Sequence, residues 1–101
     1  MKIYYHATKP ENAGNILMHG LLPSADGYVY LADSIENAVK FLALECSDIL
    51  VFSVHIKKCD EKNIEETFDH SREFFKCGAY GYHGIISPEK LGRMFHWKSD
   101  D

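Results

Sequence analysis

The stretch that decides the fold is GYVYLADSIENAVKF, residues 27–41. Its first half, Tyr28–Ala32, is a short apolar and aromatic run, which favours a buried strand over a helix. Asp33 or Ser34 then offers a side-chain oxygen to the free N–H groups of a following helix. We expect that helix over residues 34–44. The stretch therefore predicts a strand, a cap and a helix in direct succession.

Two aromatic side chains of this stretch are candidates for a common cleft. Ala38, Phe41 and Leu42 fall on one face of the predicted helix. Tyr30 belongs to the strand before it. Because Tyr30 and Phe41 come from successive elements, we expect both to project into the space between the strand end and the helix.

The N-terminal segment predicts the same kinds of element. Residues 2–6, KIYYH, favour a strand because Ile and Tyr are good strand formers. Thr8 is the expected N-cap of a helix over Pro10–His19, in which apolar residues recur at helical spacing. Pro10 suits the first turn of that helix. Gly20 is expected to end it, since glycine adopts the left-handed conformation.

The second half of the chain is expected to consist mainly of strands. Residues 49–56, ILVFSVHI, alternate their apolar side chains onto one face. Residues 57–66 are charged and weakly periodic, which predicts a loop with at most one short strand. Two further strands are expected over Ala79–His83 and Leu91–Trp97. Helices come early and strands late, which predicts one α+β domain over residues 1–101, with a split, mainly antiparallel sheet and two helices in its N-terminal half.

Composition and charge exclude several function classes. The net charge of −4 argues against a large nucleic-acid footprint. No apolar run approaches the ~20 residues of a membrane helix, and no secretory leader is visible. The odd number and wide spacing of Cys46, Cys59 and Cys77 favour reduced thiols, as in the cytoplasm. Neither a Cys-x-x-Cys nor a His-x-x-x-His pattern occurs, so we expect no metal site.

Two segments together resemble a known family. Residues 5–21, YHATKPENAGNILMHGL, resemble a motif in which a strand ends in H-G-S/T and a helix closes with I-L-x-x-G-L. Residues 27–41 resemble the segment G-x-Y-F-A-D-x-x-x-x-(S/A)-x-x-Y. Both belong to the ADP-ribosyltransferase fold, in its poly(ADP-ribose) polymerase branch, and the RNA 2′-phosphotransferases share the first. The resemblance implies an NAD-dependent ADP-ribosyltransferase, a sugar-transfer (glycosyltransferase) enzyme, of the small bacterial, phage or toxin-like kind.

The resemblance also implies which residues bind NAD. His6 matches a histidine that hydrogen-bonds the adenosine ribose, and Thr8 matches the Ser or Thr that follows in the family. Ala7 stands where many members have a glycine whose backbone binds the nicotinamide amide. Tyr30 matches a tyrosine that lines the nicotinamide pocket. The helix after it would add Phe41, stacked on the nicotinamide ring, and Ala38 as the small residue beside it.

The third motif of the family is where this sequence departs from the pattern. Polymerase-type members place a catalytic glutamate at the start of a late strand, whereas residues 77–79 here are Cys, Gly and Ala. Residues 77–89 still resemble the Y-x-G-x-I-x-P-E ending of small bacterial and phage relatives. The candidates for the missing group are Glu73 or Asp69, reaching in from the preceding loop, or else Tyr82 or His83 as a hydrogen-bonding partner. The expected catalytic set is His6, Tyr30, Glu73 and His83. Tyr82 is expected among the NAD-binding residues.

Other functions remain open from the sequence. The missing catalytic carboxylate would also fit a degenerate module that binds NAD or ADP-ribose without turnover, or a protein-interaction module. The RNA 2′-phosphotransferase alternative is weaker, because only Arg72 and Arg93 are available to hold a phosphate. The acceptor, whether protein, nucleic acid or small molecule, and the oligomeric state are not fixed by the sequence.

Overall fold

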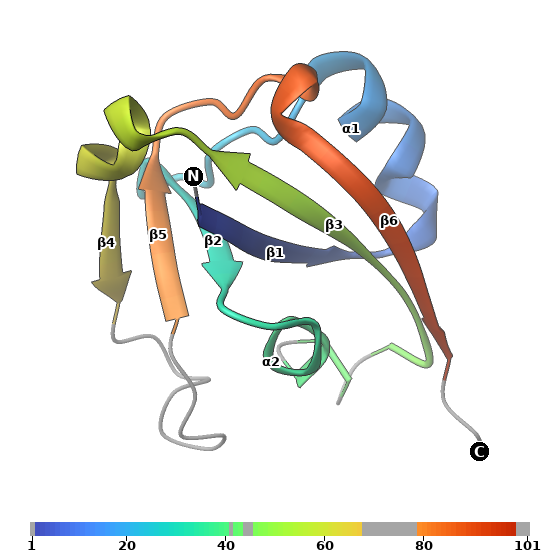
Figure 1. The fold of residues 1–101 in the computed structure, drawn as a ribbon. Coiled ribbons are helices and arrows are strands. Elements are labelled where there is room, and N and C mark those ends of the chain that lie inside the picture. The colour runs from blue at the N-terminus through green and yellow to red at the C-terminus, as the bar shows by residue number, and fades with distance from the viewer. Residues whose placement is uncertain (1, 41, 44–45, 68–78, 99–101) are drawn as a thin grey trace.

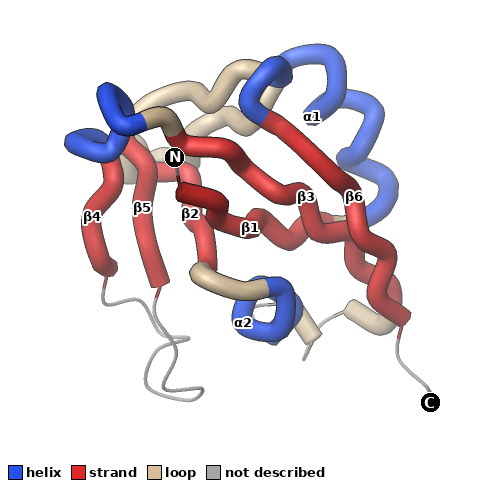
Figure 2. Tube along the Cα trace, viewed as in Figure 1, coloured by secondary structure: helices blue, strands red, loops and turns tan. Residues whose placement is uncertain are grey.

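A computed structural model describes residues 2–40, 42–43, 46–67 and 79–98. Its strands and helices are drawn in Figure 1 and coloured by type in Figure 2. In chain order they are β1 (Lys2–Thr8), α1 (Ala13–His19), β2 (Tyr28–Ala32), α2 (Ile35–Lys40), β3 (Asp48–Ile56), β4 (Ile64–Thr67), β5 (Ala79–His83) and β6 (Leu91–Lys98). Short 3₁₀ turns cover Pro10–Asn12, Lys58–Asn63 and Pro88–Lys90. Within the described residues, neither helix has the length and apolar character needed to cross a membrane.

The strands form one antiparallel sheet in the order β4-β5-β2-β1-β3-β6. This confirms the predicted α+β class with a mainly antiparallel sheet. The sheet is also split. β1 pairs with β3 along its whole length, from Lys2 opposite Ile56 to Thr8 opposite Leu50, but its register with β2 is the single pair Tyr5 and Ala32. Figure 1 shows the β4-β5-β2 strands turned away from the direction of β1, β3 and β6.

Each face of the sheet carries its own hydrophobic core. Among the described residues, the buried members of the α1-side core are Tyr4, Ile16, Leu21, Val29, Leu31, Phe52, Val54, Ile56, Tyr82 and Ile86. Those of the α2-side core are Ala32, Ala38, Val39, Ile49 and Val51. Because side chains alternate along a strand, His6 and Thr8 share the face of Tyr4, whereas Tyr28 and Tyr30 share the opposite face with Ala32.

The N-terminal helix begins differently from the prediction. Thr8 is not its N-cap but the last residue of β1, where it pairs with Leu50 and is 6% exposed. A β-branched side chain suits that strand position. The Thr8 hydroxyl oxygen accepts a hydrogen bond from the Asn12 side-chain amide at 3.3 Å. The 3₁₀ turn from Pro10 then leads into α1, so the prediction that Thr8 caps the helix was wrong.

Two other helix signals were read correctly. The Ser34 hydroxyl oxygen accepts the backbone N–H of Asn37 at 3.1 Å, as expected of a cap at the start of α2. Gly20 ends α1 with φ of 83°, in the positive region that favours glycine. A Cβ on Gly20 would lie 2.1 Å from the Ile86 carbonyl oxygen, so no larger residue fits there. The neighbouring residue Leu21 forms a β-bridge with Ile86.

Candidate functional site

His6 lies where β1 and β2 separate. Its Nδ1 is 2.8 Å from the carbonyl oxygen of Tyr30. A carbonyl oxygen only accepts hydrogen bonds, so Nδ1 carries the hydrogen and donates it, and Nε2 is left as the second ring nitrogen. The pairing of β1 with β2 is limited to the neighbouring pair Tyr5 and Ala32. The imidazole thus supplies the Tyr30 carbonyl with a partner next to that pair, where the strands part.

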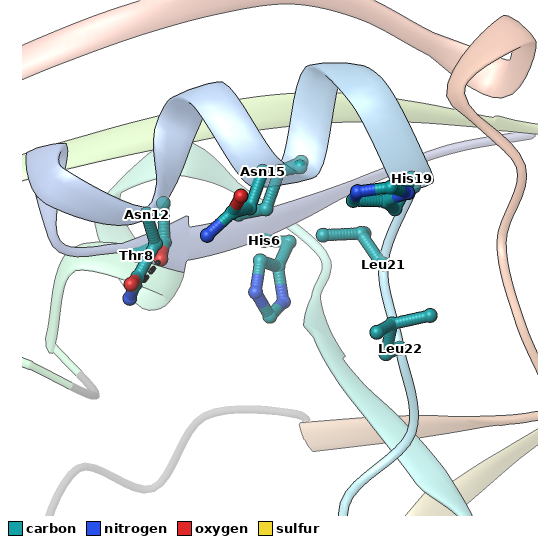
Figure 3. A pocket seen from close by; sticks show the side chains of 9 residues that line it. His6, Thr8, Asn12, Asn15, His19, Leu21 and Leu22 are labelled. Atoms are coloured by element: carbon teal, nitrogen blue, oxygen red, sulfur yellow. Dashed lines mark hydrogen bonds between the residues drawn. The ribbon is translucent and has the colours of Figure 1, made fainter.

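A cavity of about 360 Å³ opens beside His6, between the end of β1 and helix α1. Figure 3 shows His6 below the helix, with Asn15 and His19 projecting from the helix above it. The residues that line the cavity are His6, Thr8, Asn12, Asn15, Ile16, His19, Gly20, Leu21 and Leu22. Its volume lies within the roughly 300–1,000 Å³ typical of small-molecule sites. The described lining residues combine amides, a hydroxyl and imidazoles with apolar side chains, and none of them carries a carboxylate.

The surroundings of His6 favour the neutral form of its imidazole. Burial lowers the pKa of His6, and the hydrogen bond to the Tyr30 carbonyl offsets only part of that effect. A neutral imidazole whose Nδ1 donates to a carbonyl offers Nε2 as an acceptor. The site can therefore accept a hydrogen bond from a hydroxyl group of a ligand.

Tyr30 is joined to His6 through its backbone and not through its ring. The Tyr30 hydroxyl donates a hydrogen bond to the Asp26 carboxylate, and the ring centroid lies 6.2 Å from that of Tyr28. By strand alternation the ring is on the α2 side of the sheet, whereas the His6 side chain is on the α1 side. The two residues meet at the split of the sheet, but their rings face different ways.

The structure places the other predicted NAD-binding residues in three environments. Thr8 lines the cavity with His6. Ala7 is half-buried in β1 and packs against the α2-side core, to which the fully buried Ala38 belongs. Tyr82 is 4% exposed in the α1-side core. Phe41 lies outside the described residues, so the predicted stack on a nicotinamide ring stays a prediction.

The predicted catalytic residues do not gather at one point in the described part of the chain. Asp69 and Glu73 lie outside it. His83 is exposed on β5, and its Nε2 is 3.6 Å from a carboxylate oxygen of Glu65. Among the described residues of β5, from Ala79 to His83, none carries a carboxylate. The catalytic roles of His6, Tyr30, Glu73 and His83 therefore stay predictions.

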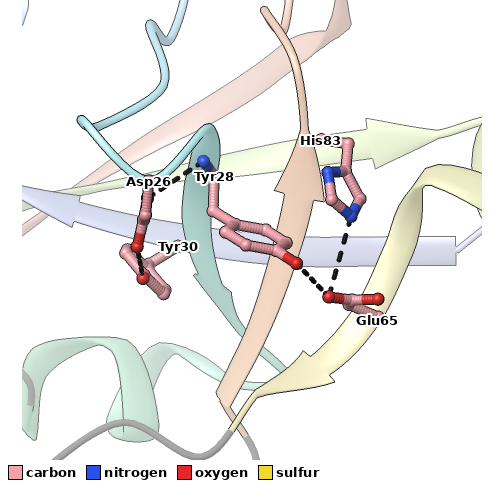
Figure 4. Close-up of polar contacts among 5 residues, drawn as sticks. All are labelled: Asp26, Tyr28, Tyr30, Glu65 and His83. Atoms are coloured by element: carbon pink, nitrogen blue, oxygen red, sulfur yellow. Dashed lines mark hydrogen bonds and ion pairs between the residues drawn. The ribbon is translucent and has the colours of Figure 1, made fainter.

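Sequence reasoning missed two groups of polar residues. The first is Asn12, Asn15 and His19, which the 3₁₀ turn and α1 bring over His6 (Figure 3). Their signal was present, since Asn15 and His19 are four residues apart and so share a helix face. The second comprises Asp26, Tyr28 and Glu65, which meet Tyr30 and His83 on the α2 side (Figure 4). Its only local signal was the spacing of Tyr28 and Tyr30 by two.

No metal site is visible in the part of the chain that the structure describes. No group of three or more His, Cys, Asp or Glu side chains there is arranged to hold an ion.

Solved structures of a bacterial toxin share this architecture. A mutant of the E. coli heat-labile enterotoxin is 14% identical, with a TM-score of 0.63, over 92% of this chain and 68% of the toxin chain. A second mutant of the same toxin gives 14% identity and a TM-score of 0.59, over 92% of this chain and 66% of the other. The toxin's A subunit is an ADP-ribosyltransferase. This chain has an ADP-ribosyltransferase-like fold.

The likeness concerns the fold alone, because the identity is low. The chain spans about two thirds of the toxin chains that it matches. No protein-family model and no curated protein sequence matches it.

Proposed function

We propose that the chain binds NAD in the cavity beside His6 and transfers ADP-ribose from it to a macromolecular acceptor. The supports are the shared fold, the two resembling sequence segments and the placement of His6. The observation that carries the proposal is the His6–Tyr30 contact. It fixes the tautomer and orientation of the ring at the sheet's split, so that Nε2 is free to bind a ligand hydroxyl.

The lining of the cavity suits one end of a dinucleotide. Sugar hydroxyls need acceptors and donors, which His6, Asn12 and Asn15 provide. A flat base needs apolar contacts, which Ile16 and Leu21 provide. None of the described lining residues is a carboxylate, so the lining does not repel the phosphates of a dinucleotide through a negative charge.

The proposed reaction breaks the bond between the nicotinamide nitrogen and the ribose. The bonding electrons leave with nicotinamide, the ribose carbon bonds to an acceptor nucleophile, and the proton of that nucleophile passes to a base. Positive charge develops on the ribose, and a nearby carboxylate is the usual way to stabilise it. We assign that carboxylate to Glu73, because β5 offers none.

The experiment is to incubate the chain with labelled NAD and to measure nicotinamide release and label transfer to acceptors. We expect release, and a loss of about tenfold or more in His6→Ala, because a hydrogen bond to the ligand is removed. His96→Ala is the matched control, since it removes an exposed imidazole from the edge strand β6. Full NAD binding and turnover in His6→Ala would show that the cavity is not the site.

The lack of a carboxylate on β5 favours a second candidate, a module that binds NAD or ADP-ribose without turnover. Such a module would be stabilised against thermal unfolding by NAD, in proportion to ligand concentration, with no nicotinamide released. Glu73→Gln separates the two: it abolishes release in an enzyme that uses this carboxylate and leaves NAD binding intact in both cases.

A further inference from the structure

His19 supplies the second imidazole of the cavity, and its setting differs from that of His6 (Figure 3). His6 is half-buried, and its Nδ1 donates to the Tyr30 carbonyl oxygen. His19 is the last residue of α1 and is exposed. No described residue forms a hydrogen bond or an ion pair with the His19 ring. Both of its ring nitrogens are therefore available to a ligand.

The phosphate groups of NAD need a partner that the lining can supply in only one place. They are negatively charged at neutral pH. No lysine or arginine is among the described residues that line the cavity, so only its two histidines can become cations. Burial lowers the pKa of His6, which favours the neutral ring there. His19 is thus the described lining residue that remains to carry a positive charge.

The position of His19 also fits the place of the phosphates. The cavity, of about 360 Å³, suits one nucleoside end of NAD, so the phosphates lie where the ligand leaves it. The exposed His19 is at this mouth, whereas the half-buried His6 is deeper. Asn15 shares the helix face of His19 and has a side-chain amide that can donate a second hydrogen bond. We propose, on the basis of the proposed function, that protonated His19 binds a phosphate group of NAD.

The charged groups of the neighbouring elements leave His19 open to such a ligand. Helix α1 packs against the first and the last of the 3₁₀ turns. The first turn carries Glu11, and the last carries Glu89 and Lys90. None of these three side chains is among the residues that line the cavity, and the Lys90 ammonium is paired with a carboxylate at 2.8 Å. The described titratable group that shares the cavity with His19 is therefore His6.

A phosphate contact through His19 makes NAD binding depend on pH. Histidine side chains gain a proton between about pH 8 and pH 5. Because the imidazolium attracts the phosphate and the neutral ring does not, NAD should bind more tightly as the pH falls. An exposed ion pair contributes little, so we expect an increase in affinity of about twofold to fivefold between about pH 8 and pH 6. Adenosine, which has no phosphate, should not show this increase.

The test is isothermal titration calorimetry of the full chain with NAD at about pH 8 and about pH 6, repeated for His19→Gln and His19→Lys. Glutamine is not protonated, so the increase at the lower pH should disappear. Lysine is charged at both pH values, so His19→Lys should bind NAD at about pH 8 more tightly than the parent. Any contribution of His6 is common to the three proteins. His96→Gln makes the same replacement at an exposed imidazole of β6 and should bind NAD like the parent.

Failure of this contact can be distinguished from failure of the proposed function. The same pH dependence of NAD binding in His19→Gln and in the parent would overturn the contact and leave the proposed function standing. Equal affinities of His19→Lys and His19→Gln at about pH 8, or an equal pH dependence of adenosine binding, would also overturn the contact. Absence of NAD binding by the parent at both pH values would overturn the proposed function and, with it, the contact.

Discussion

The two flanks of β1 differ in how they are joined to the rest of the sheet. Toward β3, every residue of β1 from Lys2 to Thr8 has a paired partner. Toward β2, the register is the single pair Tyr5 and Ala32, and the His6 side chain bonds the Tyr30 carbonyl in addition. The candidate site therefore lies where the backbone pairing of β1 with β2 ends. There the His6 side chain, and not a backbone group, forms a hydrogen bond between the two strands, and its second ring nitrogen can bind a ligand.

The largest expected effect tests the fully paired flank. Phe52 on β3 is 1% exposed and belongs to the α1-side core. Phe52→Ala should lower the free energy of unfolding by about 3–5 kcal/mol, because it removes buried ring contacts and leaves a cavity. Met94→Ala is the control, since Met94 on β6 pairs with Phe52 in the sheet but its side chain is 50% exposed. Denaturant unfolding of Phe52→Ala and Met94→Ala measures the difference; similar losses would mean that burial of the Phe52 ring is not what stabilises this flank.

A smaller effect is expected at the split. His6→Ala leaves the Tyr30 carbonyl without its side-chain donor, so the free energy of unfolding should fall by about 1–3 kcal/mol. His19→Ala removes an imidazole from the same cavity without touching that carbonyl, and should stay within about 0.5 kcal/mol of the parent. Thermal unfolding without ligand compares the two. An unchanged melting temperature in His6→Ala would show that the contact does not hold the split together.

The smallest expected effect is on the pH dependence of stability. Burial lowers the pKa of His6 in the folded state, so the unfolded chain binds a proton more readily. The contribution of His6 to stability is complete above the ordinary histidine pKa of about 6.5 and is lost as the pH falls below it toward the folded pKa. His6→Gln should reduce this acid sensitivity. Unfolding curves between about pH 7.5 and 5 measure the slope; parallel slopes in both proteins would contradict the account.

Much of the fold followed from local patterns in the sequence. The aromatic and apolar run Tyr28–Ala32 gave β2 with its observed bounds, and alternation in residues 49–56 gave β3 to within one residue. Ser34 capped α2 as its chemistry predicts. These elements were predictable because their signals depend on neighbours a few residues away.

The site was less predictable because its contacts join distant segments. Nothing near Tyr30 in the sequence shows that its carbonyl oxygen accepts a hydrogen bond from the His6 imidazole. Glu65 lies in a charged, weakly periodic stretch in which the sequence allowed one short strand but did not indicate the contact with Tyr28. The cap prediction at Thr8 was wrong because a threonine shortly before Pro10 is typical of an N-cap, whereas Thr8 pairs with Leu50 of β3 and so belongs to β1.

The bridge between Leu21 and Ile86 has a consequence for how the molecule comes together. Leu21 and Leu22 line the cavity, and Leu21 is bridged to Ile86, more than sixty positions further along the chain. A truncated N-terminal half would carry all the described lining residues but would lack Ile86, which holds Leu21 in place. We therefore expect the cavity to form, and ligand binding to become possible, only when the whole domain folds cooperatively. Ligand affinity should not increase gradually as the first strands and helices form.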